Sequence, residues 1–379
     1  MSTANINPEM LTWARERSGF SVSQFARKMG KTEERLLEWE KGQRHMTFKQ
    51  AMALAEKSYV PFGYLFLPKP PMEELPLPDL RTIDGQGVRR PSAELLDLIK
   101  LMLQRQEWYK DYLQQQLVEP STIVGSFSNN YDAVSIVKDM RVKLDVPDHP
   151  NRGNWENYYR DLVGRIEALG VLVMRQGDLG HFTRPLQVSE FRGFAIADSY
   201  APMIFVNHAD APGARLFTLM HELCHIWIGQ SGISDGDVQT HRSEEVLCNA
   251  VAAEFLVPEH EFMGLWKSGL ENWRDNLPVL ESRFHVSKWA LARRALTCDY
   301  ITQEEYVRYI ADEKEAYKNR ESSGSGPSYY VTKKAQISQN FSRAVVSQAL
   351  SGQMLLREAA QLLAMKPSNI SNFAKELQV

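Results

Sequence analysis

The residues with the clearest chemical potential are two histidines and a glutamate in the segment HELCH, at positions 221–225. Residues four apart in a helix share a face, so His221 and His225 can direct both imidazoles at one metal ion. Glu222 lies one position along, where its carboxylate can take a proton from water without competing as a ligand. Zinc suits two neutral imidazoles and a carboxylate, and its open fourth position can make a water nucleophilic near neutral pH. The spacing therefore predicts a catalytic zinc site with Glu222 as general base.

The neighbouring residues favour a metal site over an incidental match. Residues 217–220 (FTLM) and 226–228 (IWI) surround the motif with mostly apolar side chains, as in a buried helix. Burying three unpaired polar groups on such a helix would cost much free energy. A bound metal would remove that cost, whereas a surface helix with incidental histidines would not have these flanks.

The third protein ligand must come from another segment, and residues 243–258 (SEEVLCNAVAAEFLVP) are the best source. They predict a helix that ends at the proline. Glu245 shares a face of this helix with Asn249, one turn further on. Glu244 lies about 100° round, on a stripe that is otherwise apolar. We therefore expect Glu245 to be the ligand and keep Glu244 as the second choice.

Two other histidines and two cysteines are weaker candidates. His241, in a polar loop before this helix, is either a solvated residue or a contact for substrate or an oxyanion, and His260 is a distant ligand candidate. Cys224 is adjacent to His225 and so points off the metal face. Cys224 and Cys248 are both predicted to be small buried apolar residues.

The chain around the motif predicts an α+β domain. Helical patterns cover 131–144, 154–169, 214–229 and 243–256, and strand patterns cover 171–175, 191–198 and 203–207. The last two strands are joined by a short turn near residues 199–200. Residues 261–317 are again helical, and the last 50 residues predict three short helices.

Residues 215–225 and 245–258 together resemble the ImmA/IrrE family of metallopeptidases, and strand 203–207 before the motif is also similar. The resemblance covers roughly residues 155–260. It implies a zincin-like, thermolysin-like zinc site with His221, His225 and Glu245 as ligands and Glu222 as general base. Members typically cleave a specific regulatory protein, often a phage or stress-response repressor. This chain departs from the family pattern at position 224, where glycine is usual, and at position 251, where phenylalanine is common.

The first 67 residues predict a separate helical block. Helical patterns at 8–18, 21–29, 32–41 and 47–58 each follow a residue suited to an N-cap, namely Asn7, Ser21, Thr32 and Thr47. Residues 21–30 and 32–42 resemble a helix-turn-helix of the Cro/C1 (Xre) type. The resemblance implies that the helix at 32–41 enters the major groove of DNA.

The charges of this block do not all favour DNA binding. Glu33, Glu34 and Glu38 on the presumed recognition helix would repel phosphate. Basic residues that could contact DNA lie nearby: Arg27, Lys28, Lys31, Arg35, Lys41 and Arg44. A helical module that binds protein remains the alternative.

Length and composition set the outer limits. The chain has 379 residues, 43% of them hydrophobic and 24% charged, with a formal net charge of -3. Nucleic-acid binding over most of the surface is therefore excluded. Three cysteines argue against a disulfide framework. The first residues lack a signal-peptide pattern and no apolar run is long enough to span a bilayer, so we expect a cytoplasmic protein with no membrane partner.

These patterns predict four regions. They are a helix-turn-helix domain (1–67), a proline-rich linker and connecting helix (68–130), a zinc metallopeptidase domain with a small sheet (131–318), and a Gly/Ser linker with a C-terminal helical segment (319–379). The connecting helix at 92–117 is expected to pack on its own chain, although it could form a homodimer. The C-terminal helices are expected to cap the peptidase domain rather than bind DNA.

The function predicted is a zinc-dependent regulatory endopeptidase, fused to a DNA-binding module, that cleaves a specific regulatory protein such as a repressor. The alternative is a transcriptional regulator or antitoxin that binds DNA and a toxin, with a zincin domain that binds its partner without cleaving it. A zinc hydrolase of small amides is a third, weaker hypothesis.

Overall fold

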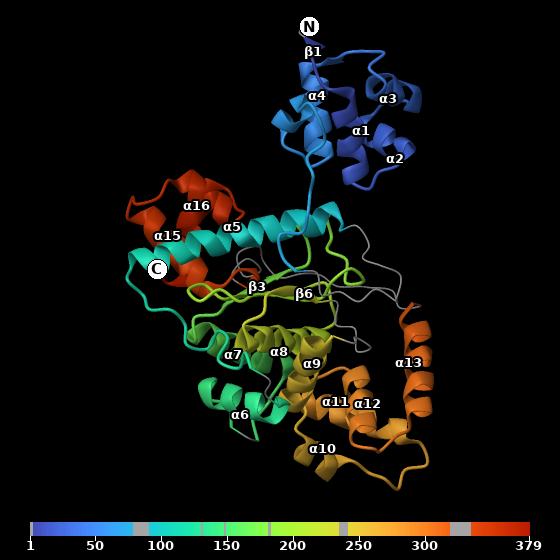
Figure 1. Ribbon diagram of the computed structural model, residues 1–379, viewed down its shortest axis with the longest axis vertical. Helices are drawn as coiled ribbons and strands as arrows, with labels where there is room; N and C mark the ends of the chain where they lie inside the picture. Colours follow the sequence, from blue (N-terminus) through green and yellow to red (C-terminus); the bar gives the residue numbers. More distant parts are fainter. Residues whose placement is uncertain are drawn as a thin grey trace. The chain divides into compact units, whose positions relative to one another are not determined.

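A computed structural model describes residues 3–78, 91–129, 132–147, 149–180, 183–234, 242–318 and 335–379 (Figure 1). The chain divides into two compact units. The N-terminal unit comprises Met1–Pro76 and Arg89–Leu101, and the large unit comprises Leu77–Val88 and Met102–Val379. The described residues are mostly helical with two small sheets, consistent with the α+β class.

The N-terminal unit contains the four helices that the sequence predicts, each within one residue of the expected bounds. They are α1 (Pro8–Arg17), α2 (Val22–Met29), α3 (Glu33–Glu40) and α4 (Phe48–Lys57), followed by the 3-10 helix η1 (Phe62–Phe66). The four predicted N-caps are confirmed, because each side chain accepts a hydrogen bond from a backbone N–H of its own helix. A two-stranded antiparallel pair, β1 (Thr3–Ala4) and β2 (Met46–Thr47), was not predicted.

The core of the N-terminal unit is apolar, and a buried ion pair between α1 and α3 lies beside it. Phe25, Leu36 and Trp39 are almost completely buried. The Arg15 guanidinium donates to the carboxylate of Glu40 at 2.7 Å. The last carboxylate of α3 is therefore used inside the unit.

The large unit is built on a four-stranded sheet in the order β3-β5-β4-β6. Its strands are β3 (Leu172–Gln176), β4 (Gly193–Ile196), β5 (Met203–Asn207) and β6 (Gly232–Ser234). β3 and β5 are parallel, whereas β4 pairs antiparallel with both β5 and β6. The three predicted strands are confirmed, and β4 is shorter than expected. β6 was not predicted, because three residues give too short a pattern.

Helices pack on both sides of this sheet. In Figure 1, α7 (Trp155–Ala168) and α8 (Pro212–Ile228) lie on one side, and the second half of α5 (Ala93–Gln115) lies on the other. α8 contacts β4, β5 and α9 (Ser243–Leu256), and α6 (Ala133–Lys143) packs on α9. The predicted bounds of α9 are confirmed, and Pro258 follows its end.

The remaining helices complete the large unit. They are α10 (Glu259–Leu265), η2 (Trp273–Asn276), α11 (Leu277–Phe284), α12 (Lys288–Thr297), α13 (Gln303–Lys318), α15 (Gln339–Leu350), α16 (Leu356–Leu362), η3 (Pro367–Asn369) and α17 (Ile370–Leu377). The buried Arg105 of α5 donates to the carbonyl oxygen of Leu362 at 2.8 Å, and Trp108 stacks edge-on against Phe341. The C-terminal helices therefore pack on α5. None of the described helices is long and apolar enough to cross a membrane.

Candidate metal centre

The HELCH motif lies in the second half of α8, and this part of the helix is fully enclosed. Every residue from Thr218 to Ile228 is buried. Gly229 ends the helix in a left-handed conformation with φ of 74°, which glycine adopts without steric cost. The three polar side chains of the motif are therefore in the core, where each needs a partner.

The structure brings His221, His225 and Glu245 together. The two Nε2 atoms lie 3.2 Å apart. The Glu245 carboxylate on α9 reaches both imidazoles, with Oε2 at 3.2 Å from Nε2 of His221 and Oε1 at 3.1 Å from Nε2 of His225. Tetrahedral zinc ligands, bound at about 2.0–2.1 Å, lie roughly 3.3 Å from one another. The spacing and the donor set both fit a zinc ion.

The electrostatics also favour metal binding. Burial lowers the pKa of His225, which keeps its imidazole neutral, as a metal ligand must be. Burial alone would raise the pKa of Glu245, but the interactions of its carboxylate with His221 and His225 outweigh burial and lower the pKa to about 2. The carboxylate is therefore ionised at neutral pH. Two neutral nitrogens and one anionic oxygen form the set that catalytic zinc prefers.

Glu222 faces the same site but does not belong to the ligand group. Its side chain is completely buried, and neither carboxylate oxygen has a hydrogen-bond partner among the described residues. Burial and the nearby Glu245 carboxylate raise the pKa of Glu222 well above its usual value, with the Ser234 hydroxyl opposing them. A cation bound between the histidines would stabilise the ionised form and oppose this shift. An unpartnered buried carboxylate beside the ligands is suited to accept a proton from a bound water.

Asn249 contacts one of the two imidazoles, and the sequence pattern alone assigned it no role of its own. Its Oδ1 atom lies 3.0 Å from Nδ1 of His221. This contact fixes the imidazole so that Nδ1 carries the proton and Nε2 is free for the metal. Asn249 lies one turn after Glu245 on the same face of α9. This shared face was the feature of the sequence that could have placed Asn249 in the site.

Gly193 was also missed, because no local pattern marks it. A Cβ atom at this position of β4 would lie 2.8 Å from Oε1 of Glu222, 2.6 Å from Thr218 and 2.8 Å from the carbonyl oxygen of Phe205. The strand therefore approaches α8 closely only because residue 193 has no side chain. Gly193 makes room for the Glu222 carboxylate.

The other candidates from the sequence lie elsewhere. Glu244 is half-buried and is not part of the ligand group. His241 lies outside the described residues. Cys224 and Cys248 are fully buried free thiols, as predicted.

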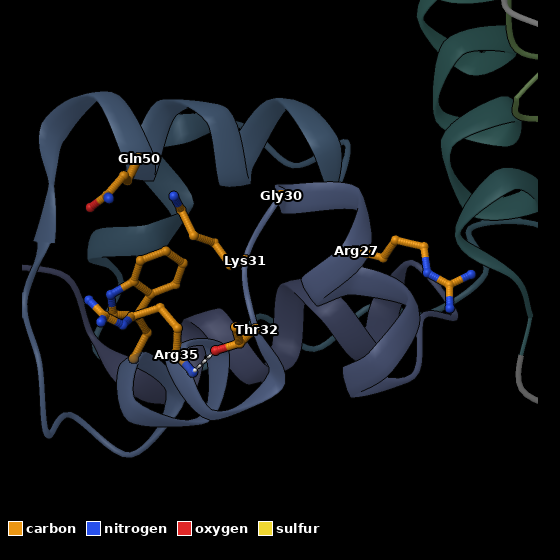
Figure 2. Close-up of a pocket in the computed structure, with 7 residues that line it drawn as sticks. Arg27, Gly30, Lys31, Thr32, Arg35 and Gln50 are labelled. Carbon is orange, nitrogen blue, oxygen red and sulfur yellow. Dashed lines mark hydrogen bonds between the residues drawn. The ribbon is translucent and has the colours of Figure 1, made fainter.

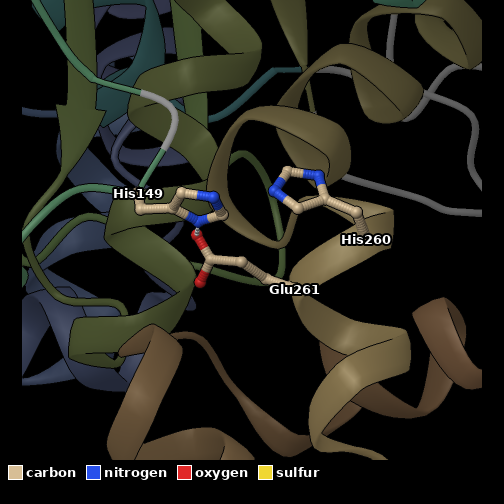
Figure 3. Close-up of side chains that lie close together, drawn as sticks. All are labelled: His149, His260 and Glu261. Carbon is tan, nitrogen blue, oxygen red and sulfur yellow. Dashed lines mark hydrogen bonds and ion pairs between the residues drawn. The ribbon is translucent and has the colours of Figure 1, made fainter.

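His260 belongs to a second group of metal-type side chains, with His149 and Glu261 (Figure 3). Nδ1 of His149 lies 3.3 Å from Oε1 of Glu261. The buried Arg152 donates to Oε2 of the same carboxylate at 3.0 Å. A metal cation would lie beside this guanidinium, and both imidazoles are open to solvent. We therefore assign this group a structural role, in which it ties the segment before α7 to α10.

Asn249→Ala is expected to lower zinc affinity by about 10- to 100-fold, because loss of a partner that orients a ligand has this effect at other zinc sites. Competition with a chromophoric chelator measures the change. Asn157→Ala, which alters an exposed asparagine on α7, is the control and should leave the affinity unchanged. Equal affinities for wild type and Asn249→Ala would show that the contact with His221 is dispensable.

Comparison with known proteins places this centre within a peptidase family model. No curated protein matches the chain. Residues 337–376 match a domain of unknown function. Residues 167–296, which include α8, α9 and the strands beside them, match the IrrE N-terminal-like domain of the ImmA/IrrE peptidases, and this match suggests a metallopeptidase of a type that is usually zinc-dependent.

Proposed function

We propose that this protein is a zinc-dependent regulatory endopeptidase that cleaves a specific regulatory protein such as a repressor. The observation that carries the proposal is the combination of three convergent ligand atoms with the unpartnered carboxylate of Glu222. Helix α8 supplies two ligands and the base, and α9 supplies the third ligand and its neighbour Asn249. Fixing these groups on two packed helices gives the precision that catalysis needs.

His221, His225 and Glu245 would hold the zinc ion. Zinc bound there would polarise a peptide carbonyl and make a water more acidic. Glu222 would take the proton from the attacking water on a carboxylate oxygen and pass it to the leaving amine. Because Glu222 is buried, bulk water does not reach its carboxylate and does not compete for hydrogen bonds with it.

Metal removal tests the proposal. Extract from cells that express the protein is incubated with the purified chain, and new protein N-termini are identified by mass spectrometry. We expect a small set of cleavage sites that disappear with 1,10-phenanthroline and return when zinc is restored. A set of cleavages that is insensitive to the chelator would belong to another protease, and absence of any zinc-dependent cleavage would contradict the proposal.

We further propose that the N-terminal unit is an Xre-type helix-turn-helix module that brings the peptidase to DNA. A hollow of about 530 Å³ at the start of α3 supports this proposal (Figure 2). Lys31 and Arg35 line it, together with Gln50 of α4. In the figure, Arg27 points away from the other labelled side chains. Two cations beside a helix N-terminus suit a phosphate of the DNA backbone.

Two carboxylates of α3 are paired with cations of the same unit, and the pairs of Glu38 also use part of the charge of Arg35 and Arg44. Glu38 forms ion pairs with Arg35 at 3.1 Å and with Arg44 at 3.6 Å. Glu40 is paired with Arg15.

Lys31→Ala is expected to weaken binding of random-sequence duplex DNA and to reduce the slope of log affinity against log salt by about 1, the change for one lost phosphate contact. Fluorescence anisotropy at several salt concentrations measures both. Lys69→Ala removes the same charge at an exposed position outside the hollow and is the control. Equal slopes for Lys31→Ala and wild type, or no DNA binding by wild type, would contradict the proposal.

A further inference from the structure

The edge of the large unit's sheet beside the metal centre is formed by β6. Among the described strands, β6 pairs with β4 alone, with Ile233 opposite Phe194 and Ser234 opposite Gly193. The outer side of an edge strand presents backbone N–H and C=O groups that can pair with another extended chain. Extended peptides commonly add to proteins at such an edge.

This edge strand lies next to β4, the strand that approaches Glu222 on α8. Gly193, the register partner of Ser234, lies so close to α8 that an added Cβ would be 2.8 Å from a carboxylate oxygen of Glu222. Ile233 is the next residue along β6. An extended peptide paired with the outer side of Ile233 would therefore lie two strands from Gly193, with β6 between them.

Another part of the same chain already uses this edge. The backbone N–H of Ile233 donates to the carbonyl oxygen of Pro78 at 3.0 Å. Leu77, the residue before it, is only 8% exposed, whereas Pro76 and Pro78 on either side are exposed. Both Leu77 and Pro78 belong to the large unit. A backbone hydrogen bond from β6 and a buried leucine beside it thus meet in this segment, and peptide addition to a sheet edge uses these two features.

The composition of this segment suits an occupant that stops further pairing. Proline has no N–H group, so Pro76 and Pro78 cannot donate to a strand on either side. A segment tethered within the same chain also competes at an effective concentration on the order of mM. A substrate peptide present well below this effective concentration, with no higher affinity for the edge, would therefore be kept from it.

We infer that Leu77 and Pro78 occupy the peptide-docking edge of this protein and hold its peptidase site in a latent state until they are displaced. The inference rests on the proposed peptidase function. It assigns the proline-rich linker a regulatory role beyond that of a spacer. It also implies that a partner or substrate activates the protein by removing Leu77 from its buried position.

Replacement of Leu77 with aspartate tests the inference in the full-length chain, because it places a charge at the buried anchor. We expect faster hydrogen exchange at the Ile233 amide. We also expect a synthetic peptide of residues 73–78 (EELPLP) to bind roughly 10- to 100-fold more tightly than to wild type, the range for losing one competing buried leucine. Met72→Asp makes the same change at a linker position that is 87% exposed and is the control. Leu77→Ala, which adds no charge, gives a second test in case the aspartate variant folds poorly.

The outcomes separate this inference from the proposed function. Faster exchange, tighter peptide binding and faster zinc-dependent cleavage in the Leu77 variants, with the Met72 variant unchanged, would support a latent peptidase. Unchanged exchange and peptide binding in both Leu77 variants would overturn the inference, even if wild type cleaves a substrate. The exchange and peptide binding of the Leu77 variants could change while no variant cleaves any protein. This result would overturn the peptidase function, and the contact of Pro78 with the edge would then have a role other than latency.

Discussion

Glu222→Gln is expected to reduce proteolysis by about 10²- to 10⁴-fold while leaving one zinc ion bound per chain. Glutamine keeps the size of the side chain but cannot accept the proton at neutral pH. Because Glu222 is not one of the three convergent ligands, zinc binding should survive. Initial cleavage rates on a substrate identified by its new N-termini, together with metal analysis by atomic emission, measure the two effects.

Glu244→Gln is the matched control, since it makes the same chemical change on a half-buried glutamate outside the ligand group. It should cleave at the wild-type rate. If Glu222→Gln also cleaves at that rate, Glu222 is not the general base. A stoichiometric complex between wild type and a partner, with no cleavage and no effect of Glu222→Gln, would instead favour the antitoxin hypothesis.

The helix-borne part of the site follows from the sequence because its information is local. The spacing of His221 and His225 places both on one face of α8, and Glu245 and Asn249 share a face of α9 in the same way. The four N-caps likewise depend on neighbouring residues. Such features require only a helical repeat and the residue types that begin and end a helix.

The rest of the site depends on contacts between distant segments, which a single sequence does not encode in any local pattern. Gly193 matters because β4 lies against Glu222 on α8. The edge at Ile233 is covered by Pro78, 155 positions earlier in the chain, and β6 has only three residues. His260 was a weak ligand candidate by residue type alone, and only its contact with His149 shows that it belongs to a different group.

Glu245→Ala is expected to have the largest effect on the metal centre. It removes the one anionic ligand, and the two remaining imidazoles, both neutral, offer the ion no compensating charge. Loss of a ligand should lower zinc affinity by more than the roughly 10- to 100-fold that loss of an orienting partner costs, so more than about 100-fold is expected. The variant should therefore be purified without stoichiometric zinc and should lose zinc-dependent cleavage.

Zinc stoichiometry and a competition titration measure the loss in Glu245→Ala, and Glu244→Ala is its control on the same turn of α9. Glu245→Asp refines the test, because it keeps the charge but shortens the side chain by one methylene group. We expect its zinc affinity to lie between those of wild type and the alanine variant, since the carboxylate must reach both Nε2 atoms across the packed α8 and α9 helices. If Glu245→Ala binds zinc with the wild-type affinity, the third ligand comes from another residue. Glu244 is then the next candidate, and Glu244→Ala should be the variant that loses zinc.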